Sequence, residues 1–586
     1  MTPQQIADKL AQQLQTGQFN AAAKLAKSAH KQFPREPHFA NVAGTALANC
    51  DKGREALPYF VKAVQLMPDH EEYQNNLVHA YIVANQHDKA RELGERYAAQ
   101  RKNPLKVYEL LLFSANLRSQ RDRIIDIATR ALDLLDGPAR LGFLLPRATA
   151  YEELGAAKEA EADLEEARSL DPENPAVIDT TANFYLSQFR PEEALALVET
   201  ALEKQNDLPA LYITQAAALT AVGRIDDART ALYKTLDLAP NHRGALTQLA
   251  EIETPEALPE LREKIRKALQ STPRGLNEWC RLMMSLGEID FRLKNYSAAG
   301  KSFAKAREEL AYLFKWHPEN SEGNFKRVID ATPKGPAILR PDAAKSPRPL
   351  FVVGQPRSGT TLTEMVLAAH PDVASCGELG AATKAAQTFL KDDAPEFDPA
   401  RFEETYRANL PPHAAGHVAL ADKMPGNYRY VGMILHGIPG ARIIHLERDP
   451  RDVALSMWRK VFKAEGMRYT NDLAHMAIEA NFYRRFMNHW KAEFPDQFMT
   501  ITYDGLVGDI EGTSRAMAEY CGLEWCEAMM EPQKTKSTVR TASVTQVREG
   551  VHKRSVGGWR RMEDALKPFV EGLDPALWPE LDLEQD

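Results

Sequence analysis

The first half of the chain carries apolar residues at helical spacing, in amphipathic segments that end before prolines. Pro34, Pro68, Pro172 and Pro240 fit an underlying period of about 34 residues. Proline ends a helix because it lacks the amide hydrogen that the next turn needs. The pattern therefore predicts a repeat of two helices per unit.

A second feature marks the turn inside each unit. Gly17, Gly155 and Gly223 precede three of those prolines by the same distance, and glycine permits the left-handed backbone of a tight turn. Such helix pairs bury their apolar faces only by stacking, so we expect an all-α solenoid over residues 1–330. Small residues at a matching phase would let the paired helices approach closely: Ala22, Ala160, Ala194 and Ala228.

The pattern changes after a proline-rich segment at 331–349, which we interpret as a linker. Short apolar runs then alternate with helical stretches, which is typical of a parallel sheet in an α/β domain. We place that domain at 350–586. The predicted strands are Leu350–Gly354, His417–Ala421, Ala441–Leu446 and Gln497–Thr502.

Composition narrows the choice of partners. The 586 residues carry a formal charge of −8, so no broad basic surface argues for nucleic acid or an anionic membrane. No apolar run approaches the roughly 18 residues of a spanning helix, and the N-terminus lacks a signal-peptide core, so we expect a cytoplasmic protein with no membrane partner. The five cysteines are scattered without metal-ligand spacing, which predicts no metal.

The first predicted strand leads into an anion-binding loop. The segment Gly354–Pro371 follows that strand and opens an amphipathic helix, whose backbone N–H groups suit a phosphate or sulfate. Thr360 stands where a nucleoside triphosphatase has its lysine, so a triphosphate is disfavoured. Arg357 instead offers a planar fork for an oxyanion.

Two motifs point to known families. Leu154–Pro172 and Val222–Pro240 resemble tetratricopeptide repeats, and Pro356–Leu362 resembles the loop of sulfotransferases that use 3′-phosphoadenosine 5′-phosphosulfate (PAPS), especially the tyrosylprotein branch. The resemblance implies an all-α tetratricopeptide-repeat solenoid followed by an α/β P-loop-type parallel-sheet sulfotransferase domain. It also implies that PAPS is bound by Arg357, Ser358, Gly359, Thr360 and Thr361.

A second segment, Ala441–Phe462, resembles the family's motif for the ribose 3′-phosphate. Arg448 at the end of a strand and Ser456 on the next helix would bind that phosphate. Related proteins have a basic residue one turn after the serine. Arg459 and Lys460 compete for this role, and we assign it to Lys460.

The resemblance also implies a catalytic pair. Glu378 matches the glutamate that acts as general base, and Lys423 matches a lysine that stabilises the leaving bridge oxygen. Tyrosylprotein sulfotransferases carry a second acid after that glutamate, whereas Leu379 follows here. The alternative for Glu378 is an exposed glutamate stabilised by a helix N-terminus.

The C-terminal stretch Thr541–Arg561 resembles the loop that closes over the nucleotide. Ser543 matches a serine that contacts the cofactor, and Tyr503 matches a tyrosine beside it. Lys553 or Arg554 would replace a basic residue that the family places near the end of this loop.

Three further residues in or near these motifs are expected to have no direct role in binding or catalysis. Arg451 and Asp452 are predicted to form solvated ion pairs, because exposed pairs are common and weak. Trp559 is predicted to fill core.

The resemblance implies a PAPS-dependent sulfotransferase that releases 3′,5′-adenosine bisphosphate and docks an acceptor, a protein or peptide, in the repeat groove. A glycan, lipid or small-molecule acceptor stays open, as does a repeat array that is only a spacer or a homodimer surface. The alternative function is a scaffold with a nucleotide-binding but inactive domain. The presence of Glu378 and Lys423 argues against that alternative.

Overall fold

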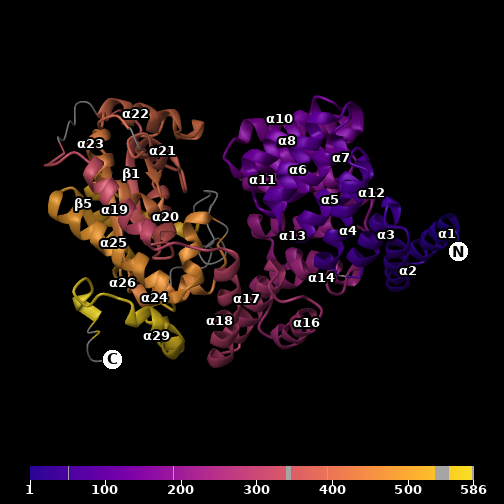
Figure 1. Cartoon of the computed structure of the whole chain (residues 1–586). Helices are drawn as coiled ribbons and strands as arrows, with labels where there is room; N and C mark the ends of the chain where they lie inside the picture. The colour runs from indigo at the N-terminus through magenta and orange to yellow at the C-terminus, as the bar shows by residue number, and fades with distance from the viewer. Residues whose placement is uncertain are drawn as a thin grey trace. The chain divides into compact units, whose positions relative to one another are not determined.

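A computed structural model of the chain describes residues 1–50, 52–188, 190–337, 345–391, 394–462, 464–534, 553–581 and 583. Internal contacts divide the chain into two compact units, Met1–Ala218 and Leu219–Asp586. The division falls within helix α13 (Figure 1). The two units are described separately below.

The first unit is a succession of helices, each packed on the next. Every helix is short, and most begin directly after the turn that ends its predecessor. This unit contains α1 (Pro3–Gln15), α2 (Phe19–Gln32), α3 (Pro37–Ala48), α4 (Gly53–Leu66), α5 (Glu71–Val83), α6 (His87–Gln100), α7 (Leu105–Leu117), α8 (Arg121–Leu132), η1 (Gly137–Arg140), α9 (Leu141–Glu153), α10 (Ala157–Leu170), α11 (Pro175–Ser187), α12 (Pro191–Lys204) and most of α13 (Pro209–Val222).

The turns within the helix pairs have the predicted left-handed backbone. Gly17, Gly155 and Gly223 have φ angles of +70°, +77° and +88°. The predicted small residues of the helix pairs are fully buried, as expected for close approach: Ala22, Ala160, Ala194 and Ala228.

The same turn also occurs without glycine. Asn85, Ser119 and Lys294 adopt φ angles of +58°, +52° and +63° at equivalent turns. Left-handed backbone costs a residue with a Cβ atom about 1–2 kcal/mol, so neighbouring packing must hold these turns in place. This explains why glycine spacing alone revealed only some of the repeats.

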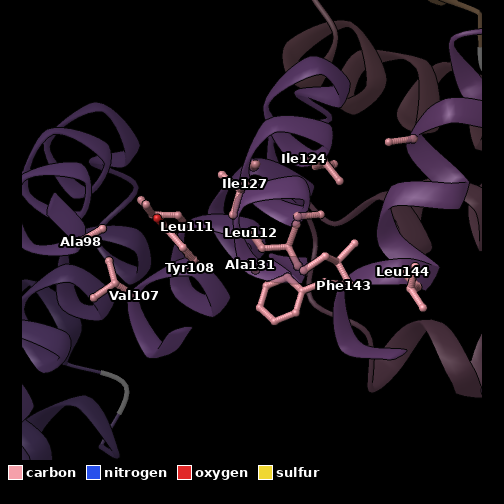
Figure 2. Packing of buried hydrophobic residues seen from close by; sticks show 14 of the residues in the cluster. Ala98, Val107, Tyr108, Leu111, Leu112, Ile124, Ile127, Ala131, Phe143 and Leu144 are labelled. Atoms are coloured by element: carbon pink, nitrogen blue, oxygen red, sulfur yellow. The ribbon is translucent and has the colours of Figure 1, made fainter. Parts of the chain in front are cut away.

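Figure 2 shows part of the core of the first unit. Leu112 of α7, Ile127 and Ala131 of α8 and Phe143 of α9 belong to one continuous buried cluster. Because each helix contributes to a layer shared with its neighbours, no single pair could bury these side chains alone.

The second unit begins with more helices of the repeat type. They are α14 (Ile225–Leu238), α15 (Arg243–Ile252), α16 (Leu258–Gln270), α17 (Asn277–Arg292), α18 (Tyr296–Leu313) and α19 (Glu319–Ala331). Together with the first unit, they confirm the predicted helical solenoid at the level of fold.

The predicted linker at 331–349 is attached to the α/β domain at its described ends. The backbone N–H of Gly335 donates to Glu493 at 2.7 Å, and the carbonyl of Ala337 accepts from Gln497 at 3.3 Å. The first strand already begins at Arg348. These contacts place both ends of the segment within the second unit.

A five-stranded parallel sheet follows, in the order β2-β3-β1-β4-β5. Four strands match predicted runs, whereas β2 was missed because it is only three residues long. Val353 pairs with His445, and Phe351 with Asp422. The strands are β1 (Arg348–Gly354), β2 (Val373–Ser375), β3 (Ala419–Asp422), β4 (Arg442–Glu447) and β5 (Phe498–Thr502).

Helices cover both faces of this sheet, so the middle strand β1 is apolar and buried from Leu350 to Val353. Val352 and Ile444 pack on one face against helices α20 and α27, while Phe351 packs on the other against Tyr406 of α22. The remaining elements of this domain are α20 (Thr360–Ala368), α21 (Ala381–Gln387), α22 (Pro399–Ala408), η3 (Pro412–Ala414), η4 (Pro425–Tyr430), α23 (Val431–Gly437), α24 (Pro450–Trp458), η5 (Glu465–Asn471), α25 (Leu473–Glu493), α26 (Tyr503–Gly508), α27 (Ile510–Cys521), η6 (Glu527–Met530), η7 (Pro532–Lys534), η8 (Gly558–Met562), α29 (Glu563–Glu571) and η9 (Pro579–Leu581).

Among the described residues, no helix combines the length and the apolar character that crossing a bilayer requires.

Two glycines of the first unit allow a matched test of the turn geometry. A Cβ atom on Gly155 or Gly142 would meet no atom within 4 Å, but only Gly155 has a positive φ. We expect Gly155→Ala to lower the free energy of unfolding by about 1 kcal/mol. Gly142→Ala, inside α9, should leave it unchanged or raise it slightly. Urea unfolding followed by circular dichroism measures both, and equal effects of the two variants would contradict this account of the turn.

Candidate functional site

The anion-binding loop joins the carboxyl end of β1 to the N-terminus of α20. Its glycines are required by close neighbours: a Cβ atom would lie 2.8 Å from the Leu446 carbonyl at Gly354, and 2.5 Å from the Tyr503 ring at Gly359. Gly359 also has a φ of +112°, which a residue with a side chain rarely adopts. The loop therefore brings its backbone close to β4 and α26, and it leads directly into the N-terminus of α20, the kind of position at which backbone N–H groups bind anions.

Arg357 is held across the loop by the helix that follows β4. Its Nε donates to the Ser456 hydroxyl at 3.1 Å. Burial, and then the charges of Arg448 and Arg459, lower the pKa of Arg357 to about 10. The guanidinium remains protonated at neutral pH, so three neighbouring cations favour an anion between them.

Arg448, at the end of β4, ties three segments together. Its Nη1 donates to the Arg357 carbonyl at 3.2 Å and its Nη2 to the Ser555 carbonyl at 2.7 Å. Its Cζ lies 4.2 Å from the centroid of the Tyr503 ring. Among the described residues, the buried Nε of Arg448 finds no hydrogen-bond partner. An unsatisfied buried donor of this kind suits an anionic ligand.

Asp452 corrects one of the sequence predictions. It is buried rather than solvated, and it accepts hydrogen bonds from the backbone N–H groups of Gly557 at 2.8 Å and Trp559 at 2.9 Å. Arg451 stacks on the Trp559 ring at 3.9 Å and pairs with Asp449. Trp559 is buried, as predicted. Asp452 therefore holds the C-terminal segment against α24.

The two basic residues after Ser456 differ in their surroundings. Arg459 lines the cavity described below, whereas among the described residues Lys460 is not part of that lining. The Lys460 ammonium instead lies 3.4 Å from Glu251 of α15. The cavity lining therefore favours Arg459, the alternative that the sequence left open, and the assignment of Lys460 to the nucleotide stays a prediction.

The predicted catalytic residues form a direct pair. The Lys423 ammonium donates to Glu378 Oε1 at 2.6 Å, with Lys423 fully buried and the Glu378 side chain 41% exposed. Glu378 lines the cavity, but Lys423 is covered and reaches it only through Glu378. Among the described residues, Glu378 Oε2 has no hydrogen-bond partner, so this oxygen is available to a ligand.

Glu364 was missed by the sequence analysis. This buried residue of α20 accepts hydrogen bonds from the Ser375 hydroxyl at 2.8 Å and from the Gly377 N–H at 2.7 Å, directly before Glu378. Burial raises the pKa of Glu364. The anion-loop helix and the Glu378 segment are therefore linked, and a glutamate on an apolar helix face was the signal that could have revealed it.

These residues surround one cavity of about 790 Å³, within the range of small-molecule sites. Part of its wall is basic, with Arg357, Arg448 and Arg459 joined by Arg554 and Arg561. The remainder of the wall includes apolar side chains from other elements: Phe291, Met424, Phe462, Met467 and Tyr469.

The other predicted cofactor residues divide into three groups. Gly359, Thr360, Thr361 and Tyr503 line the cavity. Ser358 is buried, and its hydroxyl donates to the Gln355 carbonyl at 2.8 Å, so it shapes the loop instead. Ser543 lies outside the described residues. Of the basic candidates in the C-terminal segment, Arg554 lines the cavity.

Within the described part of the chain, no group of three or more histidine, cysteine or acidic side chains could hold a metal ion.

The fold and site define a helical-repeat protein with a C-terminal parallel-sheet domain, whose cavity is lined in part by arginines. Residues 349–527 match a family model described as "Sulfotransferase family". The resemblance of this region to sulfotransferases is thereby confirmed.

Relatives extend this comparison. An uncharacterized protein of Aquifex aeolicus (strain VF5) is 31% identical over 395 residues, covering 63% of this chain and 51% of the relative, so the chain spans about half of that protein's length. A putative protein-tyrosine sulfotransferase of Caenorhabditis briggsae is 25% identical over 251 residues, covering 38% of this chain and 88% of the relative. The solved sulfotransferase domain of the Synechococcus PCC 7002 olefin synthase covers 40% of this chain and 98% of its own, at 19% identity and a TM-score of 0.29.

The role of Glu364 can be tested with two substitutions. We expect Glu364→Ala to lower turnover about 10- to 100-fold, because the Glu378 segment loses its anchor and small displacements of a catalytic group are costly. Glu364→Gln keeps an acceptor oxygen for the Gly377 N–H and should retain most activity. Ser375→Ala, which removes only one of the two donors, serves as control. Full activity of Glu364→Ala in steady-state assays would contradict this role.

Proposed function

We propose that the protein transfers a sulfuryl group from PAPS to an acceptor hydroxyl. The observation that carries this proposal is the Lys423–Glu378 pair at 2.6 Å, whose half-exposed carboxylate lines the same cavity as the anion loop. A nucleotide-binding scaffold without activity would have no use for a buried lysine that holds an acid toward the ligand.

The donor set fits a nucleotide with two separate anionic groups. The loop N–H groups, Arg357 and Thr360 would hold the phosphosulfate, while Arg448, with its unpaired Nε, and Ser456 would hold the 3′-phosphate. Thr360 leaves the loop without the lysine that neutralises a triphosphate, so ATP fits less well.

Glu378 would act as general base through Oε2. As the acceptor hydroxyl attacks sulfur, its proton passes to Glu378, the bond from sulfur to the bridging oxygen breaks, and negative charge collects on the phosphate. Lys423 orients Glu378 before the reaction. Protonation of Glu378 weakens that ion pair, so the positive charge of the buried Lys423 is less neutralised and would favour negative charge on the departing oxygen.

The helical repeats support a protein or peptide as the acceptor. We infer that they dock a protein or peptide, since stacked helix pairs form extended grooves, and that its hydroxyl enters the cavity beside Met424 and Tyr469. Transfer of labelled sulfate from PAPS into a lysate, followed by mass spectrometry, identifies the acceptor. Label found only on small molecules or glycans would contradict the peptide assignment.

Nucleotide preference tests the cofactor assignment. In calorimetry, 3′,5′-adenosine bisphosphate should bind more tightly than ATP, and Arg448→Ala should weaken it about 10- to 100-fold through loss of charged hydrogen bonds. Arg451→Ala is the matched control, because Arg451 is an arginine three residues further along the chain that stacks on Trp559 instead. Preference for ATP would exclude the sulfotransferase assignment.

Turnover tests the catalytic pair. We expect Glu378→Gln and Lys423→Met each to lower kcat by about 10²-fold or more, the scale of acid–base groups. The affinity for 3′,5′-adenosine bisphosphate should change little, because neither residue belongs to the arginine cluster. Retention of full activity by both variants would show that the assigned roles are wrong.

A further inference from the structure

The end of α24, which carries Ser456, is capped by a side chain from the repeat helices. Arg307 of α18 is fully buried, and its guanidinium donates to the carbonyls of Met457, Trp458 and Lys460 at 2.9, 2.8 and 2.5 Å. The last carbonyls of a helix lack partners within it, and a cation there also matches the helix dipole. Burial lowers the pKa of Arg307 to about 9, so the residue remains charged at neutral pH.

The neighbouring helix α17 contacts Arg459, which follows α24 and lines the cavity. The Arg459 guanidinium donates two hydrogen bonds to the Glu288 carboxylate, from Nε at 3.1 Å and from Nη2 at 2.6 Å. Phe291, one turn further along α17, stacks on it at 3.6 Å from Cζ to the ring centroid. Residues three apart share a helix face, so α17 presents both the Glu288 carboxylate and the Phe291 ring to Arg459.

The position of α17 is itself fixed within the repeat helices. Asp290, almost fully buried, accepts from Arg262 of α16 at 2.7 Å. Arg292 donates to the Ala250 carbonyl at the end of α15 at 3.0 Å. Glu288 and Phe291 therefore lie on a rigid support, which keeps the geometry of Arg459 independent of the rest of the loop after α24.

Arg459 is directed toward the anion site. It lines the cavity together with Phe291, and its charge adds to that of Arg448 around Arg357. Glu288 occupies Nε and Nη2, and among the described residues Nη1 of Arg459 has no hydrogen-bond partner. One edge of the guanidinium is thus fixed while another remains available for a ligand oxygen.

We propose that Glu288 and Phe291 of the repeat helix α17 are positioning residues of the nucleotide site, acting through Arg459. This inference rests on the proposed function, since it assumes an anionic nucleotide in the cavity. It gives the last repeat helices a part in cofactor binding in addition to any docking of an acceptor.

The chain offers a matched control. Glu251 of α15 faces Lys460 at 3.4 Å much as Glu288 faces Arg459, and both glutamates belong to repeat helices. Among the described residues, however, Lys460 is not part of the cavity lining. The charge of Glu251 also acts on Arg357 and raises its pKa. Glu251→Gln therefore removes a surface ion pair and one negative charge near the site, so it should not weaken binding of the anionic ligand.

The test is calorimetric titration of the full chain with 3′,5′-adenosine bisphosphate. We expect Arg459→Ala to weaken binding about tenfold or more and Glu288→Gln about fivefold to tenfold, while Glu251→Gln stays within about twofold. Because Glu288 acts through Arg459, adding Glu288→Gln to Arg459→Ala should cause no further loss. Phe291→Leu, which keeps an apolar side chain but removes the ring, should weaken binding in the same direction.

Each outcome is decisive. Wild-type affinity in Glu288→Gln and Phe291→Leu, unchanged affinity in Arg459→Ala, or fully additive losses in the double variant would overturn the inference and leave the proposed function intact. If Glu288→Gln does not fold, Phe291→Leu and Arg459→Ala decide the question. Failure of the wild-type chain to bind 3′,5′-adenosine bisphosphate would remove the proposed function, and this inference with it.

Discussion

The organisation of the second unit depends on buried positive charge gathered around one short loop. Arg357, Arg448 and Arg459 come from different places in the sequence. All three line the same cavity, and the charges of Arg448 and Arg459 lower the pKa of Arg357. Like charges at such distances repel, so the fold must hold them by other contacts. It does so with carbonyl oxygens, a serine hydroxyl, aromatic rings and a carboxylate from a repeat helix. An anion bound between the three arginines would stabilise the arrangement further, so the cavity favours anionic ligands.

A further charged pair of the site is that of Glu378 and Lys423. Lys423 has no access to solvent and depends on Glu378, while Glu364 fixes the backbone that leads to Glu378. The proposed nucleotide pocket and the proposed base are therefore connected through α20, which begins at the anion loop and carries Glu364 on its buried side. In the proposed reaction, binding and proton transfer would depend on this one helix, although different residues would perform them.

The sequence predicted the elements whose chemistry is local. Glycine and proline spacing predicted the repeat, and four apolar runs predicted four strands. The loop motif and the segment Ala441–Phe462 predicted Arg357, Arg448 and Ser456, which line one cavity. What it missed depends on contacts distant along the chain. Asp452 is buried by a segment about 105 residues later. Arg459 and Lys460 face different glutamates of the repeat helices, and of these two only Arg459 lines the cavity. The three-residue β2 and the non-glycine turns gave no local signal at all.

The capping of α24 by Arg307 has a practical consequence for how this protein can be divided. The sulfotransferase match begins at residue 349, but an expression fragment that started there would leave three carbonyls at the end of α24 without their donor. It would also expose Trp458, which packs on Phe303 of α18, and the apolar face of η8 to water. The smallest autonomous piece should start where the compact second unit starts, near Leu219. The start of the family match in the sequence therefore does not coincide with the start of a compact unit in the structure, so a stable fragment has to include the last repeat helices.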